Sequence, residues 1–171
     1  MDKKRIEKLI KDIIIELGED AEREGLVETP RRVSEMLEEF FKNEEKSEDL
    51  IKVFKEDFEN QGLIEVKDIR FCSLCEHHML PFRGVAHIKY LPSEGNLIGI
   101  SKLARIVNYF SKGLQIQERI TNKVADFLFS KFPIKGVEVT LEAEHLCMTI
   151  RGVKSPGAIT KTSTIRGILV N

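Results

Sequence analysis

The sequence lacks the features that mark membrane proteins, disulfide-rich proteins and nucleic-acid-binding proteins. It has no apolar run near the roughly 20 residues that cross a bilayer, and its charged first residues lead into a periodic apolar pattern, unlike a signal peptide. Three cysteines are too few, and odd in number, for a disulfide framework. With 27 basic and 28 acidic side chains, the net charge is only -1. We therefore expect a cytoplasmic protein that binds neither membranes nor nucleic acid.

What remains is typical of an ordinary enzyme-sized domain. The chain has 171 residues, of which 42% are apolar and 32% are charged. A chain of this length and composition folds as a globular unit with a substantial buried core. No internal repeat or low-complexity segment interrupts it. Because the three cysteines do not form a disulfide framework, they are available for thiol or metal chemistry.

The first sixty residues favour helices. Apolar residues recur at helical spacing over 6–17 and again over 33–41. Thr29-Pro30 is typical of a helix start, with a capping hydroxyl followed by proline. Ser47 is a candidate cap for a third, shorter helix that carries Leu50, Ile51, Phe54 and Phe58. We predict an N-terminal helical region over residues 1–60 and a catalytic region over 61–171, which together make one compact unit.

The pattern changes to strands after residue 62. Alternating or β-branched segments predict five strands, at 63–71, 84–91, 136–144, 147–153 and 165–170. Two helices are inserted among them, one opened by Ser101 and one running from about Gly113 to Phe132. Residues 154–164 are rich in Ser, Thr, Gly and Pro and are predicted to form a loop. The fold class is therefore α+β, with N-terminal helices followed by an antiparallel sheet with two inserted helices.

Two short segments carry the residues of a metal site. Cys75 and His78 stand three residues apart in the run Cys-Glu-His-His, with His77 between them. On a strand, residues two apart share a face, so His145 and Cys147 are expected to face one site. Sulfur and imidazole ligands together suit zinc. Three ligands, Cys75, His78 and Cys147, would leave one position for water, as in catalytic zinc sites. His77 and His145 would then be available for proton transfer.

A closed structural zinc site is the alternative. Cys72 and Cys75 form a Cys-x-x-Cys pair, and with His78 and Cys147 they would complete four protein ligands. Spacing alone does not separate the two kinds of site. A structural zinc beside a nucleotide-sensing pocket would make the protein a binding module rather than an enzyme.

Two further segments have the character of a ligand site. Ser101, Lys102 and Arg105 combine a helix start with two cations, which outlines an anion site. An ordinary serine cap with solvated charges explains the same residues. Glu118 and Arg119 follow on a later helix, where such a pair normally forms a solvated face.

Together these segments resemble the GTP cyclohydrolase I family, over nearly all of residues 20–171. The matching runs are 25–33 at the N-terminal helix opening, then 72–84, 90–92, 98–105, 115–121, 144–148 and 151–153. The chain differs from many members at Gly113, where they carry a basic residue and only Lys112 remains nearby. The resemblance implies the tunnelling fold and a homo-oligomer, typically a toroidal decamer with sites between subunits.

The resemblance also implies the reaction and the residue roles. The reaction is zinc-dependent hydrolysis of the guanine imidazole ring of GTP, giving formate and 7,8-dihydroneopterin triphosphate, the first step of pteridine and folate biosynthesis. It makes Cys75, His78 and Cys147 the Zn²⁺ ligands and His77 and His145 the catalytic residues. It assigns GTP contacts to Glu118, Gln117, Ser101, Lys102, Arg105, Arg151 and Arg32. A carboxylate such as Glu118 can accept hydrogen bonds from both N1–H and the exocyclic amine of guanine.

Another pterin or deazapurine enzyme of the same fold is the remaining enzyme hypothesis. The zinc-bearing pterin synthases of that group use histidines alone as ligands. The run Cys75 to His78 together with His145 and Cys147 therefore favours GTP cyclohydrolase I.

Overall fold

The N-terminal unit is a pair of helices. The structure, a computed structural model, describes residues 1–57 and 62–169 and divides the chain into Met1–Lys42 and Asn43–Asn171. Asp2 caps α1 (Lys3–Glu16) by accepting from the backbone N–H of Arg5 at 3.1 Å. Helix α2 (Thr29–Phe41) begins with Thr29 already inside the helix and Glu28 at the cap position, one residue earlier than predicted. The two helices pack against each other within this unit.

The second unit begins earlier than the predicted boundary at residue 60. A 3-10 turn at Ser47–Leu50 stands where a third helix was predicted, and β1 (Val53–Lys55) follows it. Strand β1 pairs antiparallel with β4 (Asn96–Ile98), so this segment belongs with the sheet-containing unit. Residue 58, assigned to the predicted third helix, lies outside the described residues.

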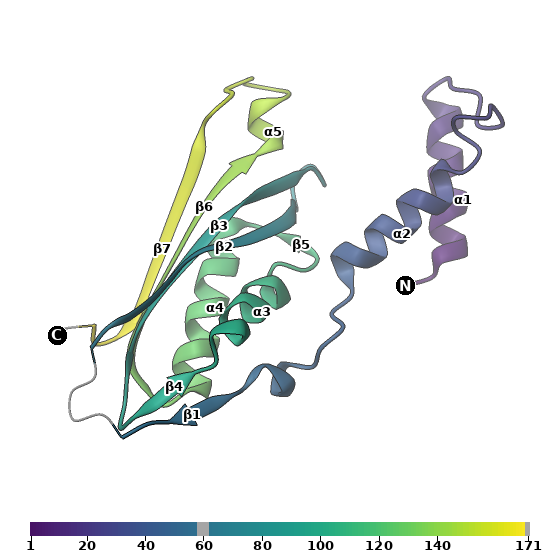
Figure 1. Cartoon of the computed structure of the whole chain (residues 1–171). Helices are drawn as coiled ribbons and strands as arrows, with labels where there is room; N and C mark the ends of the chain where they lie inside the picture. Colours follow the sequence, from purple (N-terminus) through teal and green to yellow (C-terminus); the bar gives the residue numbers. More distant parts are fainter. Residues whose placement is uncertain (58–61, 170–171) are drawn as a thin grey trace. The chain divides into compact units, whose positions relative to one another are not determined.

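A five-stranded sheet forms the centre of the second unit. Its order is β5-β2-β3-β6-β7, and the four long strands are antiparallel neighbours, as Figure 1 shows. The strands are β2 (Ile64–Cys75), β3 (Pro81–Pro92), β5 (Leu114–Gln115), β6 (Ile134–His145) and β7 (Ile159–Gly167). The short β5 pairs with the end of β2 in parallel. The predicted α+β class and antiparallel sheet are confirmed.

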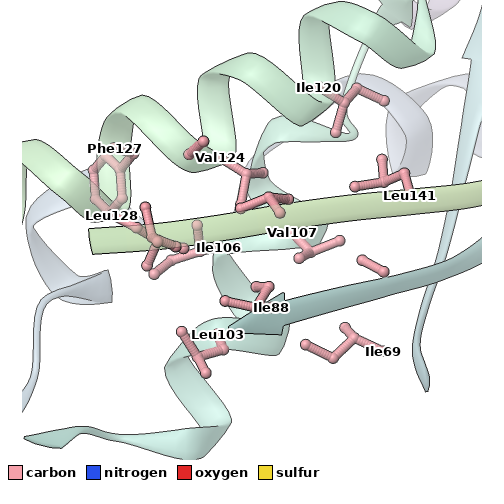
Figure 2. Packing of buried hydrophobic residues seen from close by; sticks show 14 of the residues in the cluster. Ile69, Ile88, Leu103, Ile106, Val107, Ile120, Val124, Phe127, Leu128 and Leu141 are labelled. Atoms are coloured by element: carbon pink, nitrogen blue, oxygen red, sulfur yellow. The ribbon is translucent and has the colours of Figure 1, made fainter. Parts of the chain in front are cut away.

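Two helices cover one face of this sheet. Helices α3 (Ile100–Phe110) and α4 (Gln117–Lys131) lie between strands in the sequence and together on one side of the sheet in Figure 1. Their apolar faces pack against alternate residues of the strands, because side chains two apart share a strand face. Figure 2 shows the resulting core, which includes Ile69, Ile88, Leu103, Ile106, Val107, Ile120, Val124, Phe127, Leu128 and Leu141. This core fixes where α4 begins relative to the ends of β2 and β6.

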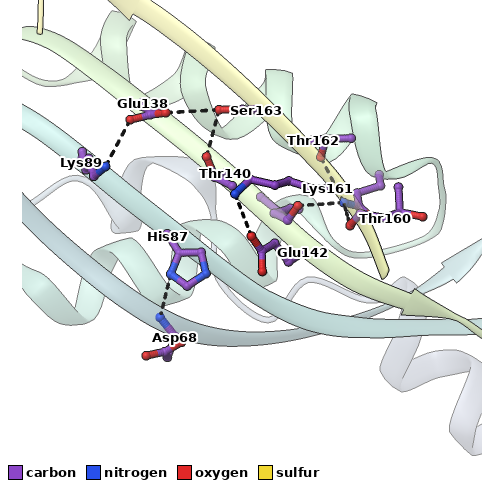
Figure 3. Close-up of polar contacts among 12 residues, drawn as sticks. Asp68, His87, Lys89, Glu138, Thr140, Glu142, Thr160, Lys161, Thr162 and Ser163 are labelled. Atoms are coloured by element: carbon purple, nitrogen blue, oxygen red, sulfur yellow. Dashed lines mark hydrogen bonds and ion pairs between the residues drawn. The ribbon is translucent and has the colours of Figure 1, made fainter. Parts of the chain in front are cut away.

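The opposite face of the sheet is polar. Lys89 lies 3.6 Å from Glu138, and Lys161 lies 2.9 Å from Glu142, on neighbouring strands. Figure 3 shows these ion pairs, with Ser163 donating to Glu138. The strands therefore alternate between an apolar face under the helices and a charged face.

Two predicted segments near the C-terminus were wrong. The strand predicted at 147–153 is instead the short helix α5 (Leu146–Thr149) followed by a turn. The loop predicted at 154–164 ends at residue 158, because β7 already begins at Ile159. Its Thr-rich sequence suits a strand, since β-branched side chains pack well on a pleated surface. Only the segment with Pro156 and Gly157 is loop.

Two connections before the helices also differ from expectation. Gly99 rather than Ser101 occupies the cap position of α3, and Ser101 lies inside the first turn. Gly113 has a φ of +82°, a left-handed conformation that glycine adopts far more readily than a basic residue. None of the helices in the described part of the chain is long and apolar enough to cross a membrane.

Candidate functional site

The residues of the predicted site meet where strands β2 and β6 end. Cys75 closes β2 and pairs with Gln115 of β5, while His145 closes β6 and pairs with Phe82 of β3. A cavity of about 420 Å³ opens at this edge. Its lining includes Cys75, His77, His78, Glu118, His145, Cys147 and Arg151. Seven of the twelve predicted site residues therefore share one cavity of a size suited to a small molecule.

Three of these side chains form a cluster that could hold a metal ion. The ligand atoms of Cys75, His78 and Cys147 all lie within 4.8 Å of one another. Cys75 is buried at the end of β2, His78 lies on the turn that follows, and Cys147 lies on α5. A backbone hydrogen bond closes this turn: the N–H of Met79 donates to the carbonyl oxygen of Cys75 at 2.8 Å. These three residues are placed to hold one metal ion.

The two sulfurs of the cluster are close. The Sγ atoms of Cys75 and Cys147 are 3.9 Å apart. A tetrahedral zinc with bonds near 2.3 Å places two sulfurs about 3.8 Å apart. Burial raises the pKa of the Cys147 thiol, and the neighbouring Cys75 raises it further. Two thiolates this close repel each other unless a cation lies between them, which is the role a divalent metal fills.

Cys72 lies away from this cluster. It is exposed, whereas Cys75 is buried, because an offset of three places the two on opposite faces of β2. Cys72 lines a different and larger hollow of about 740 Å³, with Arg70 and Arg83. The described residues bring together only three ligands here, so the closed four-ligand site that includes Cys72 is not formed.

His145 is held from two sides. Its ring stacks on Phe82, with centroids 4.5 Å apart and planes 3° from parallel. Its Nε2 lies 2.8 Å from Oε1 of Gln117. Burial lowers the pKa of His145, and Glu118 acts in the opposite direction. The sequence did not indicate the role of Phe82, because its contact with His145 depends on the pairing of β3 with β6.

The other two cavity histidines lie on the turn after β2. Nδ1 of His77 is 3.8 Å from the sulfur of Cys75. Nε2 of His78 is 3.0 Å from a guanidinium nitrogen of Arg151. Arg151 thus reaches the cluster from the turn after α5, on the cavity side. A cation at this position suits a negatively charged part of a ligand.

The first turn of α4 carries Glu118 beside the cavity and Arg119 beside the turn that follows β2. Glu118 is exposed in the first turn of α4 and lines the cavity. Arg119 forms an ion pair with Glu76 at 2.7 Å, and this pairing lowers the pKa of Glu76. Arg119, which sequence patterning placed on a solvated face with Glu118, therefore ties α4 to the turn carrying His77 and His78. Gln117 is buried and reaches His145 rather than the open cavity.

The cationic residues of α3 do not join this cavity. Lys102 donates to the backbone carbonyl of Asp49 at 2.6 Å, and Arg105 forms an ion pair with Glu45. Neither these residues nor Ser101 belongs to the cavity lining. Arg32 is exposed on α2, in the N-terminal unit. Their predicted contacts with GTP stay predictions.

The family model and the individual relatives found by sequence comparison point to the same family. Residues 6–171 match the family model described as GTP cyclohydrolase I. A protein named GTP cyclohydrolase 1 from Thermoanaerobacter pseudethanolicus is 53% identical over 169 residues, covering 98% of this chain and 89% of its own length. A protein of the same name from Clostridioides difficile is 50% identical over 169 residues, with the same coverage.

Structural comparison supports the fold. The crystal structure of an archaeosine synthase QueF-Like in the apo form matches with a TM-score of 0.52, at 15% sequence identity. It covers 64% of this chain and 97% of that chain. At this identity the likeness concerns the fold alone, and it supports the predicted tunnelling fold.

Proposed function

The chain belongs to the GTP cyclohydrolase I family and converts GTP to dihydroneopterin triphosphate, and we propose that it does so with zinc held by Cys75, His78 and Cys147. The observation that carries the zinc proposal is the three-ligand cluster opening into the cavity that also holds Glu118 and His145. Two thiolates and one imidazole suit zinc, and three protein ligands are the pattern of catalytic sites.

The metal and the histidines have separate tasks in this proposal. Zinc held by Cys75, His78 and Cys147 would lower the pKa of bound water to about 7 and so supply a nucleophile at neutral pH. His145 and His77 lie beside the ligands and transfer protons as the guanine imidazole ring opens and formate leaves. The stacking of His145 on Phe82 keeps its ring in one orientation during these transfers.

Arg151 binds the negatively charged part of GTP in this proposal. In the described structure it donates to Nε2 of His78. A neutral imidazole that binds a metal through either nitrogen has no lone pair left to accept this hydrogen bond. A metal held by His78 would therefore leave the Arg151 guanidinium free beside the cavity, where a phosphate oxygen could accept from it.

Glu118 is proposed to recognise guanine, and Glu118→Gln tests this. An amide offers one acceptor to the two N–H donors of guanine and presents its own N–H groups to them. Such mismatches cost on the order of 1–3 kcal/mol each, so kcat/KM for GTP should fall roughly 10- to 100-fold. Steady-state kinetics with GTP measure the effect.

A matched control removes the same charge elsewhere. Glu138→Gln alters a carboxylate on the polar face of the sheet, away from the cavity, and should leave kcat/KM for GTP within about 2-fold. Unchanged GTP kinetics in Glu118→Gln, with ATP still rejected, would remove Glu118 from the recognition site.

We infer that sites are completed between copies of the chain. Ser101, Lys102 and Arg105 lie outside the cavity of their own chain, so contacts with GTP from these residues would have to come from a neighbouring copy. Both sheet edges offer unpaired backbone groups: among the described strands, β7 pairs with β6 alone and β5 covers only two residues of β2. Such edges pair readily with another chain. A homo-oligomer, with the decamer implied by the resemblance, satisfies both observations.

Mixing two inactive variants tests this sharing. Arg32→Ala and Cys75→Ser are each expected to be inactive, and a mixed oligomer should regain part of the activity. Some of its sites would combine an intact Arg32 from one copy with an intact metal cluster from another. Native mass spectrometry establishes exchange, and GTP turnover measures recovery. No recovery in fully exchanged oligomers would place Arg32 outside any shared site.

Product analysis tests the function as a whole. The zinc-loaded protein incubated with GTP should release formate and, after oxidation, a fluorescent pterin. Zinc content near one ion per chain with neither product would refute the proposed role of the cluster and leave a metal-binding module. The assay therefore separates the enzyme from the nucleotide-sensing alternative.

A further inference from the structure

The side chain of Gln117 is committed to the protein itself. It is the first residue of α4 and is 1% exposed. Its Nε2 lies 2.9 Å from the carbonyl oxygen of Leu141 and 3.0 Å from that of Thr160, with the Thr162 hydroxyl at 3.1 Å. Its Oε1 lies 2.8 Å from Nε2 of His145. No amide hydrogen of Gln117 is left for a bound nucleotide.

These contacts fix the orientation of the Gln117 amide. Backbone carbonyl oxygens only accept, so the amide nitrogen has to face Leu141 and Thr160. The amide oxygen consequently faces His145, and because it too only accepts, Nε2 of His145 has to carry the hydrogen. Two backbone carbonyls of β6 and β7 thus determine the tautomer of a cavity histidine through one buried amide.

The remaining nitrogen of His145 is then the reactive one. The ring is stacked on Phe82, and its Nε2–H is occupied by Gln117. Nδ1 is left as the ring nitrogen with a lone pair in the neutral imidazole. The hydrogen bond made by one ring nitrogen sets the state of the other in this way in many catalytic histidines.

We propose that Gln117 is a positioning residue that holds His145 as the Nε2–H tautomer and makes Nδ1 the atom that exchanges a proton with the reactants. This rests on the proposed function, in which His145 takes part in opening the guanine ring. As the C8–O bond forms, a proton passes from water to Nδ1. As the C8–N bond breaks, that proton passes from Nδ1 to the departing ring nitrogen. The two transfers return His145 to its starting tautomer.

The tautomer can be read directly. The chain has four histidines, so ¹⁵N-histidine labelling of the zinc-loaded protein gives few imidazole signals, and His145→Gln identifies those of His145. Solid-state NMR should show a protonated Nε2 and an unprotonated Nδ1 in the unsubstituted protein. In Gln117→Met, which keeps the side-chain length but has no amide oxygen, the Nδ1–H form should appear as well. A protonated Nδ1 in the unsubstituted protein would overturn the proposal.

Kinetics separate positioning from a structural or substrate-binding role. Gln117→Met should lower kcat about 10- to 100-fold, with bound zinc unchanged and the Kd for GTP within about 3-fold. Thr162→Val is the matched control, because it removes one acceptor of the same amide and leaves Leu141, Thr160 and His145 in place. It should lower thermal stability yet keep kcat within about 2-fold.

The other outcomes have distinct meanings. Weakened GTP binding at unchanged kcat in Gln117→Met would make this residue a substrate contact and refute positioning. Equal losses of kcat in Gln117→Met and Thr162→Val would reduce it to a structural residue. An unsubstituted protein with the Nε2–H tautomer but no GTP turnover would refute the proposed function while the tautomer itself stands.

Discussion

Replacing Cys147 with serine should empty the metal site and abolish the opening of the guanine ring. The cluster would keep only Cys75 and His78, and a serine hydroxyl does not ionise near neutral pH to replace a thiolate. Zinc content should fall from about one ion per chain to near zero. Elemental analysis after dialysis, together with formate release from GTP, measures both effects.

Cys72→Ser is the matched control for this experiment. It makes the same sulfur-to-oxygen change on the opposite, exposed face of β2. Zinc content and activity should both remain close to those of the unsubstituted protein. Loss of zinc from Cys72→Ser would show that a fourth ligand comes from this face, and it would favour the closed structural site over the catalytic one.

Strand and helix patterns predicted most of the second unit because its core is strictly amphipathic. Val137, Val139 and Leu141 alternate along β6, and all three are fully buried under the helices. Such spacing determines which face of the strand is buried, and it does so without knowledge of the neighbouring strand. The prediction failed at β7, where Thr-rich sequence resembles a loop until its pairing with β6 is known. The local amino-acid composition carries no information about this long-range strand pairing.

The metal cluster could be predicted, but part of its geometry could not. Sequence spacing indicated that His145 and Cys147 meet in one site, and both do line one cavity. The reason given was wrong, because Cys147 lies on α5 and not on a strand continuing from His145. The contacts of Phe82 and Gln117 with His145 depend on strand register and on where α4 begins. Neither follows from the motif residues alone.

The contrast between His145 and His78 should separate proton transfer from metal binding. His145→Ala and His77→Ala each remove a side chain beside the cluster but outside its three ligands. Zinc content should therefore be retained, while turnover falls about 100- to 10,000-fold for loss of a positioned acid or base. His78→Ala should lose the zinc together with the activity.

The physical difference lies in the lone pair. A ligand nitrogen holds its lone pair on the metal throughout the reaction, whereas an acid–base nitrogen has to gain and release a proton. Nε2 of His145 is already hydrogen bonded to Gln117, which leaves Nδ1 as the nitrogen that can gain and release a proton. We expect one of the two zinc-retaining variants to accumulate a ring-opened formyl intermediate, if its histidine acts only after the first hydrolysis.

Metal analysis beside product analysis decides between the roles. Each variant is loaded with zinc, dialysed, and assayed both for bound metal and for the formate and pterin formed from GTP. If His145→Ala or His77→Ala empties the site while His78→Ala keeps its zinc, the ligand and proton-transfer roles are exchanged. The cluster of Cys75, His78 and Cys147 would then need a different third ligand, because two sulfurs 3.9 Å apart do not complete a catalytic zinc site by themselves.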